Sequence, residues 1–118
     1  MLSRMKKPKK TKRMKVIFED VKRIAGTDQV PIEHAMGKLF EEVGELAQCV
    51  NMTNGMKVTD LTFPQIVLEA KQEIVDVIQN CFWVAQKLGI SFEELKECFE
   101  EKNDKWEAKI KIKNATVK

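Results

Sequence analysis

The chain has 118 residues, which is enough for one domain with a modest hydrophobic core and too few for a second catalytic domain. Hydrophobic residues make up 43% of the sequence and charged residues 33%, and no apolar run approaches the roughly 18 residues of a membrane span, so we expect a soluble protein. The net charge of +3 is unevenly distributed, because residues 1–15 hold eight of the 21 basic residues and none of the 18 acids.

Residues 1–15 are predicted to form a basic, flexible arm. Runs of like charge tend to be disordered and often contact nucleic acid, and Pro8 disfavours a helix. The arm has no apolar stretch followed by a small-residue cleavage site, so a secretory signal is not predicted and we expect a cytoplasmic protein. Weak contact with nucleic acid and a simple solubilising role are both open for this arm.

Two helices are predicted in the first half of the chain. The first covers about residues 14–25, where apolar residues recur at helical spacing, and it stops at Gly26. The second covers about residues 31–52 and has Pro31, a favoured first-turn residue, at its start.

Two more helices are predicted in the second half. The third starts with Thr62 as N-cap and Gln65 as its capping-box partner, and Gly89 marks its end. The fourth covers about residues 91–110, and a polar, frayed tail of residues 111–118 follows.

The predicted fold class is all-α, because no segment alternates apolar and polar residues for long enough to make a strand. The four helices of residues 16–110 are expected to pack around a shared core as a bundle with small crossing angles. A bundle of this size gains further core by pairing with copies of itself, so we expect a homodimer or homotetramer.

Acidic side chains form a stripe on the second predicted helix. Successive helical residues are about 100° apart, which aligns Lys38, Glu41 and Glu45 and puts Glu42 at the flank of this stripe. A solvated surface would explain these residues equally well. Lys38 could contact a phosphate or could simply pair with Glu41 or Glu42.

The third predicted helix is more informative. Glu69, Glu73, Asp76 and Asn80 share one face, yet residues 74–85 are apolar nearly all round, which predicts a helix buried on most sides. An ionised Asp76 in such a segment needs a partner, and no Arg or Lys lies three or four residues away. A divalent cation between the two helices would supply it. Asn80 could contact a sugar or base, or could be a buried structural amide.

The ligand types point to a hard cation. Carboxylates without thiolate or imidazole suit Mg²⁺, with Mn²⁺ as a substitute. Cys49, Cys81 and Cys98 are odd in number and contain no CxxC pair, so neither a disulfide framework nor a thiolate metal site is predicted. The single histidine, His34, does not provide the Glu-x-x-His motifs of ferritin-like di-iron sites.

Three stretches together resemble the MazG-like all-α nucleotide pyrophosphohydrolase family: HAMGKLFEEVGELAQCV (34–50), EIVDV (73–77) and EEKNDKW (100–106). That family's pattern is an E-E-x-x-E helix, an E-x-x-D helix and a later Lys/Asn-rich segment. The resemblance implies that Mg²⁺ is bound by Glu42, Glu45, Glu73 and Asp76. It also implies that Glu41 orients or deprotonates the attacking water, and that the triphosphate is held by Lys102, Asn103 and Lys105.

The resemblance further implies an enzyme that hydrolyses a (d)NTP at the α-phosphorus, giving the monophosphate and pyrophosphate. Phosphoribosyl-ATP, dUTP or dCTP hydrolysis within the same superfamily is an alternative that the acids do not separate. A non-enzymatic helical module that binds nucleic acid through the basic arm is an alternative of another class.

Overall fold

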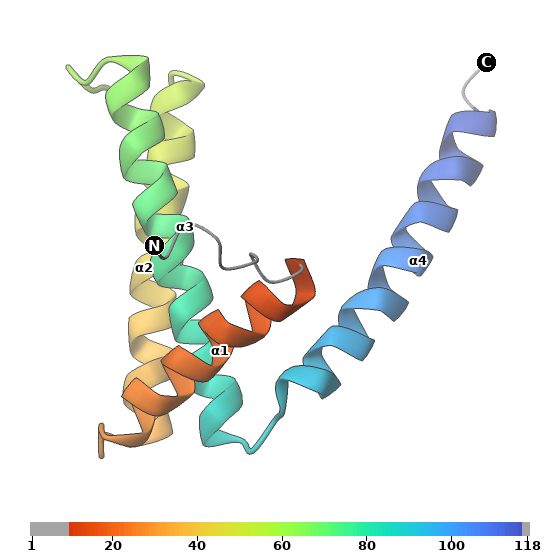
Figure 1. Ribbon diagram of the computed structural model, residues 1–118. Coiled ribbons are helices and arrows are strands. Elements are labelled where there is room, and N and C mark those ends of the chain that lie inside the picture. The colour runs from red at the N-terminus through yellow and green to blue at the C-terminus, as the bar shows by residue number, and fades with distance from the viewer. Residues whose placement is uncertain (1–9, 117–118) are drawn as a thin grey trace, which may run out of the picture.

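The computed structural model describes residues 10–116 as four helices (Figure 1): α1 (Lys10–Gly26), α2 (Ile32–Thr53), α3 (Phe63–Lys87) and α4 (Phe92–Thr116). No strand occurs within these residues, so the all-α prediction is confirmed. None of the helices in this range has the length and apolar character needed to cross a membrane.

The first and last helices are longer than the sequence predicts. α1 starts at Lys10, inside the predicted arm, and α4 continues through most of the predicted polar tail to Thr116. Lys15 pairs with Glu93 of α4 at 2.7 Å, and Lys111 pairs with Glu107 one turn earlier at 2.9 Å. The Lys111–Glu107 pair, four residues apart, favours helix in a segment that lacks an apolar pattern, and the Lys15–Glu93 pair joins α1 to α4. Residues 1–9 of the arm and 117–118 of the tail lie outside the described range.

Both ends of α3 have the predicted capping chemistry. The Gln65 N–H donates to the Thr62 hydroxyl at 3.3 Å, and the Thr62 N–H donates to the Gln65 side chain at 2.8 Å, which completes a capping box. At the other end Gly89 has a φ of 72°, and the Ile90 N–H donates to the Ala85 carbonyl at 2.9 Å. This is a Schellman motif, and it turns the chain away from the axis of α3.

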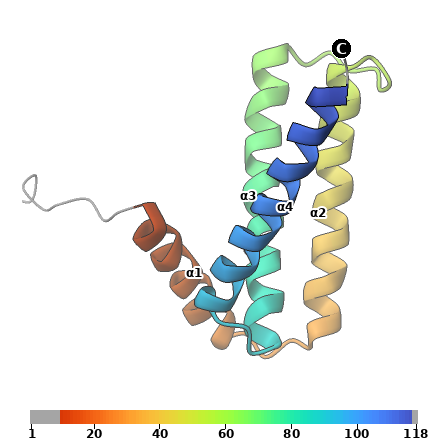
Figure 2. The same cartoon turned by 90° about the vertical axis from the view of Figure 1, so that its right-hand side faces the viewer.

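α2 and α3 form an antiparallel hairpin and lie side by side along most of their length (Figures 1 and 2). Small or medium residues are buried between them, including Ala35 and Cys49 of α2 and Ile66 of α3. Small residues allow the two helices to approach closely, so polar groups that face the partner helix come within reach of each other.

α1 crosses α3 near its C-terminal end. Phe18 of α1 is 1% exposed and meets the Phe82 ring edge-on, with 5.0 Å between ring centroids. Phe92 contacts the Phe18 ring, with 5.9 Å between ring centroids, and Ala85 completes the buried cluster. Three helices therefore meet at one aromatic residue, which anchors α1 and the start of α4 to the hairpin.

α4 stands apart from the hairpin. No Cα atom of α4 lies within 8 Å of a Cα atom of α2 or α3, and none of its residues is buried. Figure 1 shows the helix leading away from the other three after the Gly89 turn. The single chain therefore does not close the expected four-helix bundle.

The predicted burial of α3 on most sides is also not found in the single chain. Ile74, Val75 and Ile78 are 46%, 49% and 41% exposed, and Cys81 is exposed as well. Ile74, Val75, Ile78 and Cys81 thus form an apolar surface that no described helix of the same chain covers, whereas Phe82 and Ala85 are buried in the cluster with Phe18.

Candidate metal centre

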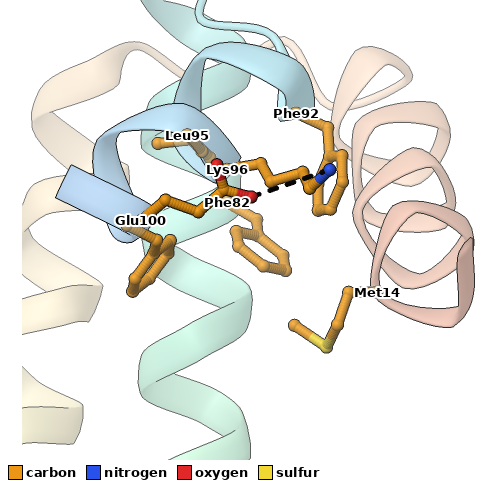
Figure 3. Close-up of a pocket in the computed structure, with 7 residues that line it drawn as sticks. Met14, Phe82, Phe92, Leu95, Lys96 and Glu100 are labelled. Atoms are coloured by element: carbon orange, nitrogen blue, oxygen red, sulfur yellow. Dashed lines mark ion pairs between the residues drawn. The ribbon is translucent and has the colours of Figure 1, made fainter. Parts of the chain in front are cut away.

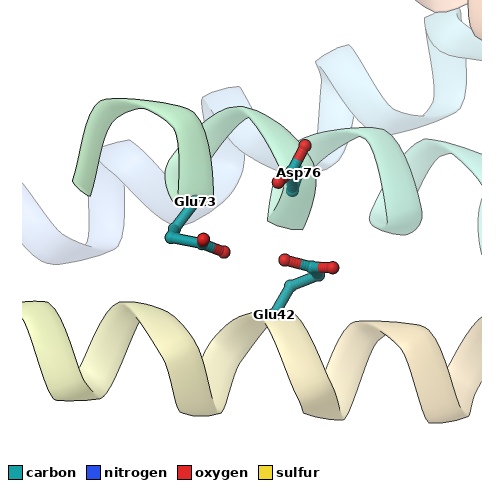
Figure 4. Close-up of side chains that lie close together, drawn as sticks. All are labelled: Glu42, Glu73 and Asp76. Atoms are coloured by element: carbon teal, nitrogen blue, oxygen red, sulfur yellow. The ribbon is translucent and has the colours of Figure 1, made fainter. Parts of the chain in front are cut away.

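Three carboxylates converge between α2 and α3. Glu42, Glu73 and Asp76 each offer an oxygen atom, and these atoms all lie within 4.8 Å of one another. Figure 4 shows Glu42 pointing from α2 toward α3, with Glu73 directed back toward α2. Each of the three is half-buried.

Helix periodicity explains how these side chains meet. Glu73 and Asp76 are three residues apart, so both lie on one face of α3, and the hairpin holds Glu42 opposite them. Glu45 follows Glu42 by nearly one turn and lies within hydrogen-bond reach of Glu73. All four predicted metal ligands are therefore in one region of the hairpin, with Glu42 at its centre rather than at the flank of the acidic stripe.

The cluster changes the acidity of Glu73. The pKa of this carboxyl is raised from 4.5 to about 7, first because its protonated form hydrogen-bonds to Glu42. Loss of solvent around the carboxyl adds to the rise, as do the hydrogen bond and the negative charge of Glu45. A carboxyl that would be ionised in water is thus about half protonated near neutral pH.

Two oxygens in the cluster lack donors. One carboxylate oxygen of Glu42 and one of Glu73 are shielded from solvent and receive no hydrogen bond from another described residue. A proton shared between the two carboxyls is one way to satisfy them, and a cation is the other.

None of the ion pairs that the structure gives among the described side chains, residues 13–116, reaches the cluster. These pairs involve other acids, and the nearest along the chain joins Lys38 to Glu41 at 3.7 Å. Glu41 is exposed and is not part of the converging group. The pairing foreseen for Lys38 is therefore present, and Glu41 lies at the rim rather than in the cluster.

Asn80 lies one turn beyond Asp76 on α3 and is half-buried. Its side-chain N–H donates to the Asp76 carbonyl oxygen at 2.8 Å. This bond fixes the amide along the helix axis and leaves its oxygen available to a ligand.

The predicted phosphate-binding residues are not brought to the acids within one chain. Lys102, Asn103 and Lys105 lie on α4, whose backbone does not approach α2 or α3. Lys102 and Asn103 instead line a hollow along α4 with Phe99 and Trp106.

Sequence reasoning missed one residue beside this region. Asp28, in the loop after α1, lines a cavity together with Asn80 and Trp83 of α3. No local pattern could have singled out Asp28, because its place depends on how α1 packs on α3.

The donor set fits a hard divalent cation. The converging atoms are carboxylate oxygens, two of them without a donor, and such oxygens are the ligands preferred by Mg²⁺ and Mn²⁺. No protein-family model, curated protein or solved structure matches this chain. Function must therefore be argued from the site itself.

Proposed function

We propose that the chain is a Mg²⁺-dependent nucleoside triphosphate pyrophosphohydrolase of the MazG-like kind, with Mn²⁺ as a substitute ion. The observation that carries the proposal is the convergence of Glu42, Glu73 and Asp76 from two helices, with solvent-shielded oxygens that lack donors. Like charges held this close are unfavourable unless a proton or a cation lies among them.

In this proposal the ion is held by Glu42, Glu73 and Asp76, with Glu45 beside them. The chemistry supplied by a divalent ion at such a site is neutralisation of phosphate charge and a lower pKa for an attacking water. Without the ion, the protonated form of Glu73, whose pKa is about 7, hydrogen-bonds to Glu42, so this proton must leave as the ligand set forms.

Glu41 is the proposed proton acceptor for the water that attacks the α-phosphorus. It follows Lys38 by three residues and pairs with it at 3.7 Å, at the solvent-exposed rim next to Glu42. An exposed carboxylate can pass a proton to solvent, as a general base in hydrolysis must. The bond to the α-phosphorus forms from this water, and pyrophosphate leaves.

The cations for the triphosphate are proposed to come from a second copy of the chain. Lys102, Asn103 and Lys105 cannot reach the acids of their own chain without movement of α4 as a whole. A homodimer or a homotetramer in which α4 of one copy covers the hairpin of another would bring these residues to the phosphates.

Exposed apolar surface supports this assembly. Phe99 and Trp106 are 62% and 67% exposed, and together they leave roughly 250 Å² of aromatic surface in water. A standard interface buries about 800 Å² per partner, a little more than half of it apolar. The exposed Ile74, Val75 and Ile78 of α3 contribute much of the remaining apolar area.

A groove beside α4 extends this apolar surface. It has a volume of about 360 Å³ and lies between α1, α3 and the start of α4 (Figure 3). Figure 3 shows Phe82 between Met14 and the first turns of α4, with the Lys96–Glu100 ion pair at the rim.

The test of the activity is a panel of NTPs with Mg²⁺, read out as pyrophosphate against orthophosphate. Asp76→Asn and Glu45→Gln are expected to abolish pyrophosphate release with the helical circular dichroism unchanged. Glu69→Gln, on the same helix but outside the cluster, is the matched control and should keep full activity. Full activity of Asp76→Asn would refute the proposal. Salt-sensitive RNA binding without any response to metal would favour the nucleic-acid module instead.

The test of the assembly is the molar mass in solution by light scattering. We expect a multiple of the 13.6 kDa chain mass, and Trp106→Glu should shift the protein toward a single chain. Val58→Glu, at a loop position that is 97% exposed, is the control and should leave the mass unchanged. A wild-type mass of one chain would rule out the second copy.

A further inference from the structure

A row of lysines runs along one side of the second half of α4. The row consists of Lys102, Lys105, Lys109 and Lys113. Spacings of three and four residues keep these side chains on one side of the helix, and at about 1.5 Å per residue the row is about 16 Å long. All four lysines are exposed, and Figure 1 shows this half of α4 leading away from the other helices.

The lysine row has no acidic partner within the described part of the chain. None of the ion pairs that the structure gives among residues 13–116 includes one of these lysines. No acid lies three or four residues from Lys102, Lys109 or Lys113. Lys105, Lys109 and Lys113 instead follow one another at four-residue intervals, a spacing at which like charges repel and weaken a helix. An anion bound along the row would remove this repulsion.

The other two lysines of α4 are placed differently. Lys96 pairs with Glu100 at 3.7 Å and Lys111 pairs with Glu107 at 2.9 Å, each across one turn of the helix. At about 100° per residue, these two lysines lie about 135–165° round the helix from the centre of the row. α4 thus keeps paired charges on one side and positive charge without an ion pair on the other.

The helix dipole does not account for the row. Cations are favoured at a helix C-terminus only within the last turn, and in α4, which ends at Thr116, that turn includes Lys113 alone of the row. The other three lysines of the row lie about two to four turns before the end of the helix. Their positions therefore call for a reason outside the helix itself.

The row is separate from the apolar surface that is proposed to contact a second copy. Phe99, Trp106 and Ile110 form a stripe centred about 75° round the helix from the row, and they are 62%, 67% and 41% exposed. When this stripe is covered, the long lysine side chains at its edge keep their ammonium groups in water. The row is thus accessible in one chain and at the rim of an assembly.

We propose that the lysine row binds the phosphate backbone of single-stranded nucleic acid. A line of cations without counter-charges complements a line of phosphates, and binding releases the counterions that the strand holds. The contact is to phosphates, so no sequence preference is expected. The inference goes beyond the proposed hydrolysis and does not rest on it. Residues 1–9 of the basic arm lie outside the described range and are not part of the row.

The charge on the far side of α4 favours a single strand over a duplex. A duplex major groove is about 12 Å wide and encloses a helix on both sides, so it would bring phosphates against Asp104 and Glu107 as well. A single strand contacts the row alone. The same acids disfavour an anionic membrane surface, because helices that lie on membranes carry basic residues over their polar face.

Fluorescence anisotropy with a labelled oligothymidylate of about 20 nucleotides, in EDTA and at several salt concentrations, tests the proposal. We expect saturable binding with a Kd below about 100 µM at low salt. Lys109→Gln/Lys113→Gln should reduce the slope of log affinity against log salt by about 1.4, because each single-strand phosphate contact contributes about 0.7. This change corresponds to about 20-fold weaker binding near 0.1 M salt.

The matched control is Lys96→Gln/Lys111→Gln, which removes the same charge from the same helix but from lysines that are already paired. The control should keep the slope and change the affinity by less than about three-fold, and circular dichroism should show both variants helical. Equal losses in the two variants would overturn the proposal, since only net charge would then matter. Unchanged binding by Lys109→Gln/Lys113→Gln would overturn it in favour of contacts elsewhere, such as the basic arm.

Two further ligands test the choice of partner. A duplex of the same length should bind more weakly than the single strand, and equal or tighter duplex binding would overturn the proposal. Vesicles that contain phosphatidylserine should not bind in a manner that depends on Lys109 and Lys113. Such vesicle binding without binding of the oligothymidylate would assign the row to a membrane surface instead.

These outcomes can be separated from the fate of the proposed activity. The oligothymidylate has no triphosphate and the buffer has no metal, so its binding does not depend on hydrolysis. Binding through the row without pyrophosphate release from any NTP would sustain this inference and refute the hydrolase. Pyrophosphate release without binding of the strand would do the opposite.

Discussion

Raising the pH from about 6 to about 8 is expected to tighten the binding of Mn²⁺ or Mg²⁺ to the Glu42–Glu73–Asp76 cluster by about ten-fold. The reason is the proton on Glu73, whose pKa is raised to about 7 by Glu42, by loss of solvent and by Glu45. A carboxyl must lose this proton before it binds a cation.

The magnitude follows from the titration of that one group. One unit below the pKa about one Glu73 in ten is ionised, and one unit above it about nine in ten are, so the apparent affinity rises by about ten-fold. Roughly 0.9 proton should be released per ion bound near pH 6 and about 0.1 near pH 8.

Isothermal titration calorimetry in two buffers of different ionisation enthalpy measures both the affinity and the protons released. Glu73→Gln should bind the ion more weakly and without this pH dependence, whereas Glu69→Gln should behave as wild type. A wild-type affinity that changes less than about two-fold over this pH range would refute the reasoning, as would a Glu73→Gln variant that keeps the full pH dependence.

Three further predictions concern stability. Without metal, the free energy of unfolding should fall as the pH rises from 4.5 to about 7, because Glu73 loses its proton at a lower pH in the unfolded chain than in the folded chain. Urea titrations in EDTA measure this fall, and Glu73→Gln should flatten it. A free energy that rises across this window would contradict the raised pKa. Phe18→Ala should lower the free energy of unfolding by about 3–5 kcal/mol in urea, since the ring is buried against Phe82, and a loss below about 1 kcal/mol would show that α1 is not anchored there. Thr62→Ala should cost about 1 kcal/mol through loss of the α3 cap, whereas Thr53→Ala, at the last residue of α2, should cost less; equal losses would argue against the capping box.

Local signals in the sequence were sufficient for much of the fold. Thr62 with Gln65 and Gly89 predict both ends of α3, because caps depend on residues adjacent in the chain. The side-by-side placement of Glu73 and Asp76 was equally predictable, since an i, i+3 pair on a helix always shares a face.

Features that depend on packing were not predictable in this way. Helical periodicity predicted an acidic stripe on α2 with Glu41 and Glu45 at its centre. The packing of α2 on α3 instead directs Glu42 into the carboxylate cluster. The direction of α4 is set by the Gly89 turn and by contacts near Phe92, which helical periodicity does not encode. The raised pKa of Glu73 likewise requires two helices at close range.

The exposure of α4 has a consequence for the evolution of its sequence. Beyond Phe92 and Leu95, which pack against the Phe18–Phe82–Ala85 cluster, the fold of the single chain constrains the α4 sequence only through helix propensity and a few ion pairs. Phe99 and Trp106 should therefore mutate freely unless a contact outside the chain selects them. Two deep mutational scans, one for solubility and one for activity, would reveal such selection. The selected positions would tolerate substitution in the solubility screen and not in the activity screen.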